Sequence, residues 1–175
     1  MSPELLGFDA DARVLILNCD DLGMHEAVNV AIFDSVENGV ATSCSLMVPC
    51  PGAADAIRML RERPHVPFGI HLTLIRDTPR YVWGPSSPKA DVPSLLDPDT
   101  GELFTDEPVN RNRMLAQGRL DDVERELRTQ IKTVLDAGLP LPTWTGTASA
   151  TAAAGTSSTS DWRSLANMVS PPVSG

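Results

Sequence analysis

Three short apolar runs alternate with two segments of helical spacing in the first 75 residues. The runs lie at residues 13–18, 41–48 and 66–74, contain β-branched side chains, and the first reads RVLILN. Between them, residues 25–37 and 51–64 place apolar side chains three or four positions apart. Strands that alternate with helices in this way form βαβ units around a parallel sheet. The chain is therefore predicted to be an α/β protein.

A further helix is expected after a long irregular stretch. Residues 76–118 have no clear periodicity and contain six prolines. A loop of that length inside a compact domain is uncommon and is usually a lid or a binding loop, with a floppy insertion as the alternative. Helical spacing resumes at residues 120–138, where Asp121 and Glu124 resemble an N-terminal capping pair and Gly138 ends the helix.

Charge and composition exclude several classes of partner. The formal net charge of −9, without a basic patch, argues against nucleic acid or an anionic membrane as the main partner. The chain has no 18-residue apolar stretch and no signal-peptide pattern at its N-terminus, so a cytoplasmic location is predicted. Three cysteines, Cys19, Cys44 and Cys50, lack C-x-x-C spacing and are expected to be core residues.

Two adjacent aspartates, Asp20 and Asp21, follow the first apolar run, and His71 lies late in the third. Functional residues of parallel α/β proteins gather at the carboxyl ends of the strands, so these side chains are expected on one rim. Adjacent carboxylates repel each other unless a cation or a proton intervenes. A divalent metal bound by one aspartate and His71 would resolve this conflict, while the other carboxylate takes a proton from water. A helix cap with a solvated charge and a hydrogen-bonded core histidine are the alternatives.

Four motifs follow one another in the chain: NCDDLG at residues 18–23, Val28-Asn29, TSCSLM at residues 42–47 and GIHLTL at residues 69–74. Together they resemble the YdjC, or ChbG-like, family of carbohydrate (chitooligosaccharide) deacetylases, over about residues 13–140. The resemblance implies a distorted (β/α) barrel of the polysaccharide-deacetylase-like type (glycoside hydrolase/deacetylase). This chain would supply the N-terminal part of that barrel.

The resemblance also implies the chemistry. One divalent metal ion, Mg²⁺ or Zn²⁺, would be bound by Asp21 and His71, and Asp20 would be the general base. The reaction would be hydrolysis of the N-acetyl group from acetylated amino sugars or oligosaccharides. His25 departs from the small residue expected beside the turn. It is either a substrate contact or an ordinary residue of the first helical turn, and the second interpretation is favoured.

The similarity ends near Pro142. Residues 1–142 are predicted to be the deacetylase-like domain, with the Pro-rich loop at 76–118, and residues 143–175 a low-complexity tail, out of frame or disordered. Catalytic zinc sites usually have three protein ligands, and the family is expected to supply its further histidine after the last helix. Seventeen of the eighteen residues from Thr143 to Ser160 are Ala, Thr, Ser or Gly, and no histidine follows His71.

The genetic code offers an explanation for this change of composition. In the reading frame one nucleotide back, the last base of the Trp144 codon and the first two bases of the Thr145 codon spell GAC, which encodes Asp. The neighbouring codons permit Thr-His-Leu before it and Trp-His after it, a segment of the kind that is missing. We therefore predict a frameshift in the gene or in its sequencing, and a natural low-complexity tail is the alternative.

A full barrel needs about 250 residues, whereas the family-like part supplies three strand–helix units. Such a part has an open sheet edge, so association between copies or poor solubility is expected, together with little deacetylase activity. Two other classes of function stay open. One is an amidohydrolase like those of the lactam-utilisation family, and the other is a non-catalytic remnant that binds a sugar or a partner.

Overall fold

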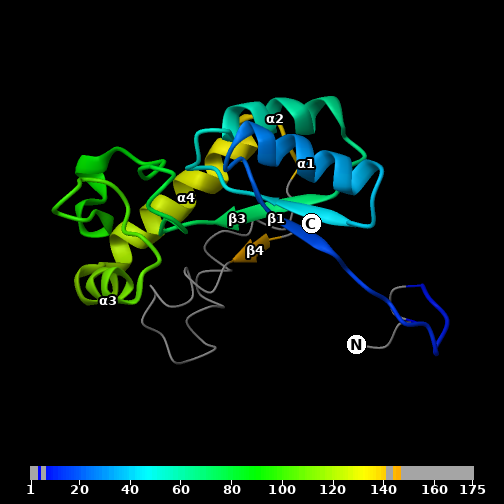
Figure 1. Cartoon of the computed structure of the whole chain (residues 1–175), viewed down its shortest axis with the longest axis horizontal. Helices are drawn as coiled ribbons and strands as arrows, with labels where there is room; N and C mark the ends of the chain where they lie inside the picture. Colours follow the sequence, from blue (N-terminus) through cyan, green and yellow to red (C-terminus); the bar gives the residue numbers. More distant parts are fainter. Residues whose placement is uncertain (1–3, 5–6, 141–143, 147–175) are drawn as a thin grey trace, which may run out of the picture.

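The computed structural model describes residue 4, residues 7–140 and residues 144–146. Its centre is a four-stranded parallel sheet in which the strands follow the order of the chain (Figure 1). The strands are β1 (Asn18–Leu22), β2 (Ser43–Leu46), β3 (Phe68–Leu72) and β4 (Trp144–Gly146). The helices are α1 (Glu26–Glu37), α2 (Ala53–Glu62), α3 (Pro108–Gln117) and α4 (Leu120–Asp136). The predicted α/β class with a parallel sheet is confirmed.

Helices α1, α2 and α4 pack on one face of this sheet, whereas Met114 of α3 belongs to a separate small cluster with Ile75 and Phe104. Cys44 and Leu46 of β2 pair with Phe68 and Ile70 of β3, and all four belong to one buried hydrophobic cluster. Helix α4 adds an apolar stripe to the same cluster, formed by Val123, Leu127, Ile131 and Val134. Figure 1 shows α1 and α2 lying side by side over the sheet. The apolar positions of the strands and helices thus form a single core.

Polar residues occupy the alternate positions of the strands. Because successive side chains of a strand point to opposite faces, Ser43 and Ser45 lie on the face opposite Cys44 and Leu46. Asn18 pairs with Ser43 in register, and its side chain accepts a hydrogen bond from the Ser43 hydroxyl at 2.7 Å. The face turned away from the helices is therefore polar in β1 and β2.

The first strand begins later than the sequence predicted. Residues 13–17 were expected to be strand, but β1 begins at Asn18, and Val14, Leu15 and Ile16 are exposed. The reason is pairing: β2 begins opposite Asn18, and the Thr42 amide donates to the Leu17 carbonyl just before the ladder. The second and third strands are likewise shorter than predicted, at residues 43–46 and 68–72.

The Pro-rich stretch and the start of α4 also differ from the prediction. Residues 108–117, inside the stretch predicted to be irregular, form α3, with Pro108 in its first turn. Helix α4 begins after Arg119, and no side chain caps it, so the predicted Asp121–Glu124 capping pair is wrong. Its end is as predicted, because Gly138 adopts a positive φ of 74°.

One polar row on α4 holds the Pro-rich stretch in place. Asp122 accepts hydrogen bonds from the Ser94 amide and hydroxyl, and Glu126 accepts the amides of Ser86 and Ser87, both at 2.8 Å. Four residues further on, the Gln130 side chain bonds both the amide and the carbonyl of Thr73. The row therefore fixes the chain just beyond β3, the strand that carries His71.

The cysteines are core residues, as predicted. Cys44 and Cys50 are buried, Cys19 is partly buried against the same cluster, and all three are free thiols. Burial raises the pKa of the Cys44 thiol to about 12, with a smaller contribution from Cys19. Within the described part of the chain, no helix has the length and apolar character needed to cross a membrane.

We predict that Asp122→Asn destabilises the protein in a pH-dependent way. Burial opposes ionisation of Asp122, but the hydrogen bonds from Ser94 and the charge of Arg125 outweigh it and lower its pKa. Stability from Asp122 is therefore present above the ordinary aspartate pKa and is lost as the pH falls through the lower native pKa. We expect a loss of about 1 to 3 kcal/mol in the free energy of unfolding at pH 7, shrinking towards pH 3.5, by urea titration.

The matched control is Asp121→Asn, one position earlier and exposed, which should change the free energy of unfolding by less than about 0.5 kcal/mol. An equal loss for Asp122→Asn at both pH values would contradict the role given to its charge.

Candidate functional site

Asp20 and Asp21 lie in an irregularity of β1. Cys19 pairs with Cys44 and Leu22 with Leu46, so β1 has one residue more than β2 between these pairs. Asp21 adopts a φ of 67°, which is uncommon for a residue other than glycine. Bulges of this kind redirect side chains and are frequent next to active sites. The bulge gives the two adjacent carboxylates different partners.

Asp20 belongs to the polar face of the sheet. Its Oδ1 accepts hydrogen bonds from the Ser45 hydroxyl and from the Asn18 side-chain amide, each at 2.6 Å. Ser45 is completely buried. These two donors fix the orientation of the Asp20 carboxylate.

Asp21 approaches His71 from the other side of β2. Its Oδ1 lies 3.5 Å from His71 Nδ1, and its backbone N–H points to the same nitrogen with an N–N distance of 3.4 Å. His71 is 4% exposed. Burial raises the pKa of Asp21, His71 lowers it, and the negative charge of Asp20 raises it further. The structure thus brings together all three predicted site residues.

Asp21 and His71 fit as two ligands of one cation. Ligand atoms at about 2.1 Å from a tetrahedral zinc ion are about 3.4 Å apart, which is close to the 3.5 Å between Asp21 Oδ1 and His71 Nδ1. A cation bound at Nδ1 would replace the Asp21 backbone N–H, which points to the same nitrogen. Among residue 4, residues 7–140 and residues 144–146, no group of three His, Cys, Asp or Glu side chains is arranged to hold a metal ion. The described residues therefore supply two donors where a catalytic zinc site uses three.

The turn after the two aspartates is held by Asn29, which is completely buried in α1. Its side-chain oxygen accepts the Gly23 amide at 2.7 Å, and its Nδ2 donates to the Gly52 carbonyl at 3.0 Å and to Asp55 at 3.3 Å. Gly23 has a φ of 97°, and a Cβ there would lie 2.9 Å from the Met47 carbonyl oxygen. The turn therefore needs glycine and a hydrogen-bond acceptor at position 29.

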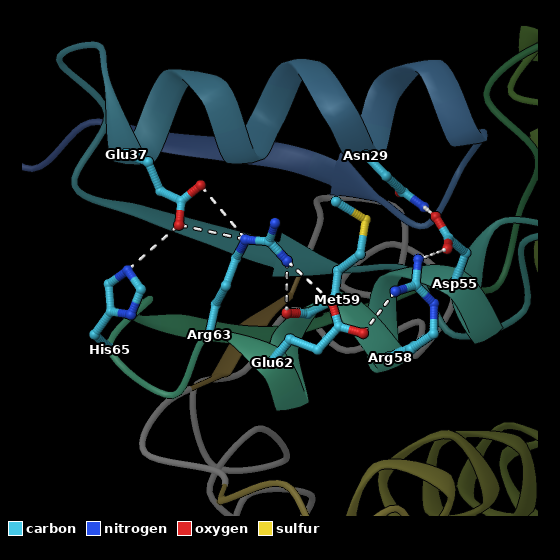
Figure 2. A network of polar contacts seen from close by, with 8 residues as sticks. All are labelled: Asn29, Glu37, Asp55, Arg58, Met59, Glu62, Arg63 and His65. Atoms are coloured by element: carbon cyan, nitrogen blue, oxygen red, sulfur yellow. Dashed lines mark hydrogen bonds and ion pairs between the residues drawn. The ribbon is translucent and has the colours of Figure 1, made fainter.

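Figure 2 shows that this support continues into α2, where Asp55 contacts both Asn29 and Arg58. At the other end of α1, the Glu37 carboxylate accepts a hydrogen bond from Arg63 Nε, and its Oε1 lies 3.4 Å from His65 Nε2. The two helices are thus joined by polar contacts at both ends. Because Asn29 lies in α1 and Gly52 and Asp55 lie at α2, the Asp20–Asp21 turn depends on their packing.

Three residues near the site were not assigned to it from the sequence. Asp77 follows β3, and burial and the charge of Asp21 raise its pKa, while His71 lowers it. Asp77 is therefore within electrostatic range of the predicted ligands. His25 is the N-cap of α1, because its Nδ1 accepts a hydrogen bond from the Ala27 amide at 3.1 Å. It therefore lies one position before the first helical turn, in which the sequence had predicted it. Its ring is 5.9 Å from that of Tyr81. The position of Asp77 after a predicted strand could have marked it as a site residue. The contact between His25 and Tyr81 could not be predicted, because it joins segments that are distant in the chain.

A groove opens beside the two aspartates along β1 and α1. Its volume is about 440 Å³, and it is lined by Cys19, Asp20, Asp21, Met24, Ala27, Val28, Ala31, Ile32 and Ser35. The lining is apolar apart from the two carboxylates and Ser35. The predicted base and one predicted metal ligand are therefore accessible from this side of the sheet.

The fold and site define a parallel α/β protein with two carboxylates at the carboxyl end of β1 and a histidine at that of β3. A family model described as YdjC-like protein matches residues 14–144. The chain belongs to the YdjC-like family, which confirms the resemblance seen in its motifs.

Curated relatives carry one description. A carbohydrate deacetylase of Geobacillus stearothermophilus is 35% identical over 127 residues, which cover 73% of this chain and 46% of that protein. The carbohydrate deacetylase of Brevibacillus brevis has the same identity and coverage. That of Listeria monocytogenes serotype 4a is 32% identical and covers 73% of this chain and 48% of its own length. The chain spans about half the length of the curated relatives it matches.

A solved structure supports the fold. A protein of Enterococcus faecalis V583, described as a cellobiose-phosphate cleavage protein, superposes with a TM-score of 0.66 at 22% identity. The match covers 91% of this chain and 66% of that chain. At this identity the likeness shows a shared fold.

We predict that Asn29→Ala lowers the free energy of unfolding by about 2 to 4 kcal/mol, because it leaves the buried Gly23 amide and Gly52 carbonyl without the Asn29 side chain. Urea unfolding followed by circular dichroism measures the change. Asn38→Ala is the control, since Asn38 is exposed and its side chain contacts only its own helix through Asp34. Equal losses for the two variants would show that Asn29 does not hold the turn.

Proposed function

We propose that this chain carries the N-terminal part of the active site of a metal-dependent hydrolase that removes N-acetyl groups from acetylated amino sugars or oligosaccharides. The observation that carries the proposal is the placement of Asp20 beside the Asp21–His71 pair. The names of the curated relatives support the substrate class. The intact protein would be a distorted (β/α) barrel, and the in-order strands with helices on one face support that architecture.

Asp21 and His71 would hold the metal ion, Mg²⁺ or Zn²⁺. The imidazole favours zinc, because magnesium prefers oxygen ligands. When bound, such an ion polarises the amide carbonyl and makes water more acidic. Asp20 would accept a proton from the attacking water, and its hydrogen bonds to Ser45 and Asn18 orient it for that role. An amide is hydrolysed to acetate and an amine in this reaction.

The missing ligand would belong at β4. Thr145 lies opposite His71 in the parallel register of β3 and β4. In the shifted reading frame, the Asp codon overlaps the codon of Thr145. Both observations support a third ligand contributed by this strand, or by the chain after it, in the intact protein. Apart from residues 144–146, the predicted tail lies outside the described residues.

The exposed apolar residues before β1 suggest how copies of this chain could associate. Val14, Leu15 and Ile16 are exposed next to a strand that pairs on one side with β2. Such an edge favours pairing with another chain, so we propose that copies of this chain associate. We also propose that the protein acts in the cytoplasm, on the sequence argument alone.

We predict weak zinc binding that needs both proposed ligands. His71→Gln and Asp21→Asn should each weaken Zn²⁺ affinity at least tenfold, measured by competition with a chromophoric chelator. Thr145→His should strengthen it at least tenfold, because it places a third ligand type opposite His71. His65→Gln is the matched control, since His65 is exposed and contacts Glu37 instead. Unchanged affinity in both His71→Gln and Asp21→Asn would refute the proposed ligand pair.

We predict that the 175-residue chain releases acetate from N,N′-diacetylchitobiose at least tenfold more slowly than the Geobacillus stearothermophilus relative assayed alongside, because its described residues supply two metal ligands where three are needed. EDTA should abolish the release, and Asp20→Asn should lower its rate about a hundredfold or more. Release that persists in Asp20→Asn would refute the role of Asp20 as base. Saturable sugar binding with no acetate release would instead select the non-catalytic remnant.

A further inference from the structure

Two aromatic side chains from distant segments meet beside the polar site. The rings of His25, at the start of α1, and Tyr81, in the stretch after β3, have centroids 5.9 Å apart and planes inclined by 43°. Tyr81 is partly buried against the hydrophobic core, whereas His25 is exposed. The pair thus exposes ring surface to solvent, while Tyr81 is fixed by its packing against the core.

Both rings are held by other contacts. His25 Nδ1 accepts the Ala27 amide, so in the neutral ring the proton is on Nε2, which can donate to a ligand oxygen. Tyr81 packs against the hydrophobic core, two residues before the buried Trp83. A site held in advance in this way loses little entropy when a ligand binds.

The aromatic pair and the predicted catalytic residues share one rim. His25 follows directly on the turn in which the Met24 amide donates to the Asp21 carbonyl at 3.0 Å. Asp77 precedes Tyr81 by four residues, and its charge interacts with those of Asp21 and His71. His25 is thus only four residues from Asp21 on the same turn, and Tyr81 contacts it from the stretch that follows β3.

This combination of groups suits a carbohydrate. A pyranose ring has an apolar C–H face and a rim of hydroxyl groups. Aromatic rings offer a flat apolar surface with a polar tip, and carboxylates accept hydrogen bonds from hydroxyl groups. His25 and Tyr81 supply the ring surface, and Asp77, four residues before Tyr81, supplies a carboxylate acceptor.

We propose that His25 and Tyr81 form a subsite that stacks on the pyranose unit adjacent to the one being deacetylated, with Asp77 accepting a hydroxyl of that sugar. This inference rests on the proposed function for its substrate class, and it assigns the recognition of the adjacent sugar to named residues. The subsite lies in described residues that precede β4. Sugar binding at this rim therefore does not depend on the missing metal ligand.

The test measures binding without turnover. The full 175-residue chain is titrated in EDTA with N,N′-diacetylchitobiose and with N-acetylglucosamine, and binding is followed by ligand-observed NMR. We expect Tyr81→Leu to weaken disaccharide binding about fivefold or more and to change monosaccharide binding less than twofold. His25→Asn, which keeps an N-cap side chain, should also weaken disaccharide binding.

Two control variants test whether the effect on binding comes from the aromatic ring of Tyr81 itself. Tyr81→Phe keeps the ring and should bind the disaccharide within about twofold of the unaltered chain. Phe8→Leu removes an exposed aromatic ring near the N-terminus and should have no effect. The thermal unfolding midpoint of each variant shows whether it is folded.

The proposal is overturned if the unaltered chain shows no saturable disaccharide binding, if folded Tyr81→Leu binds the disaccharide normally, or if it loses affinity for both sugars equally. Its failure is distinct from failure of the proposed function. Acetate release without Tyr81-dependent binding refutes the subsite alone. Tyr81-dependent binding without acetate release refutes the catalytic assignment alone.

Discussion

The hydrogen bond from the Gly23 amide to the buried side chain of Asn29 is the interaction on which the site depends. It fixes the turn that follows the bulge, and the bulge in turn separates the two adjacent carboxylates, so that Asp20 faces Ser45 while Asp21 faces His71. Without a fixed turn, the positive φ of Asp21 would be costly to maintain. Asn29 also donates a hydrogen bond to the Gly52 carbonyl. The conformation of the site therefore depends, through this one side chain, on the packing of α1 against α2.

The two faces of the sheet have different roles: one forms the hydrophobic core and the other carries the residues of the proposed site. One face carries the buried apolar side chains that join α1, α2 and α4 in a single core. The other face carries small polar residues in β2, and their size leaves room for Asp21 and His71 to approach each other across that strand. The row of Asp122, Glu126 and Gln130 fixes the end of β3 from the helix side. The position of His71 therefore depends on residues far from it in the chain.

The sequence was sufficient to predict the alternation of strands and helices, and the meeting of Asp20, Asp21 and His71, because strand ends of a parallel sheet share one rim. Residues 13–17 were misassigned since apolar character says nothing about whether a pairing partner exists. Asp121 and Glu124 were misassigned as a capping pair because the helix already begins at Leu120, and Glu124 pairs with Arg128 instead. The meeting of His25 and Tyr81 could not be predicted, because these residues are distant in the chain and are brought together only by folding.

The charge on the rim gives a physical reason for the site to bind a cation. Burial raises the pKa of both Asp21 and Asp77. The charge of Asp20 raises the pKa of Asp21 further, and the charge of Asp21 raises that of Asp77. Ionised carboxylates this close together repel one another, so a positive charge placed between them is favoured. A divalent metal at Asp21 and His71 would satisfy that requirement before the reaction. The ammonium group of a deacetylated sugar would satisfy part of it afterwards, which links the electrostatics of the rim to both the proposed cofactor and the proposed product.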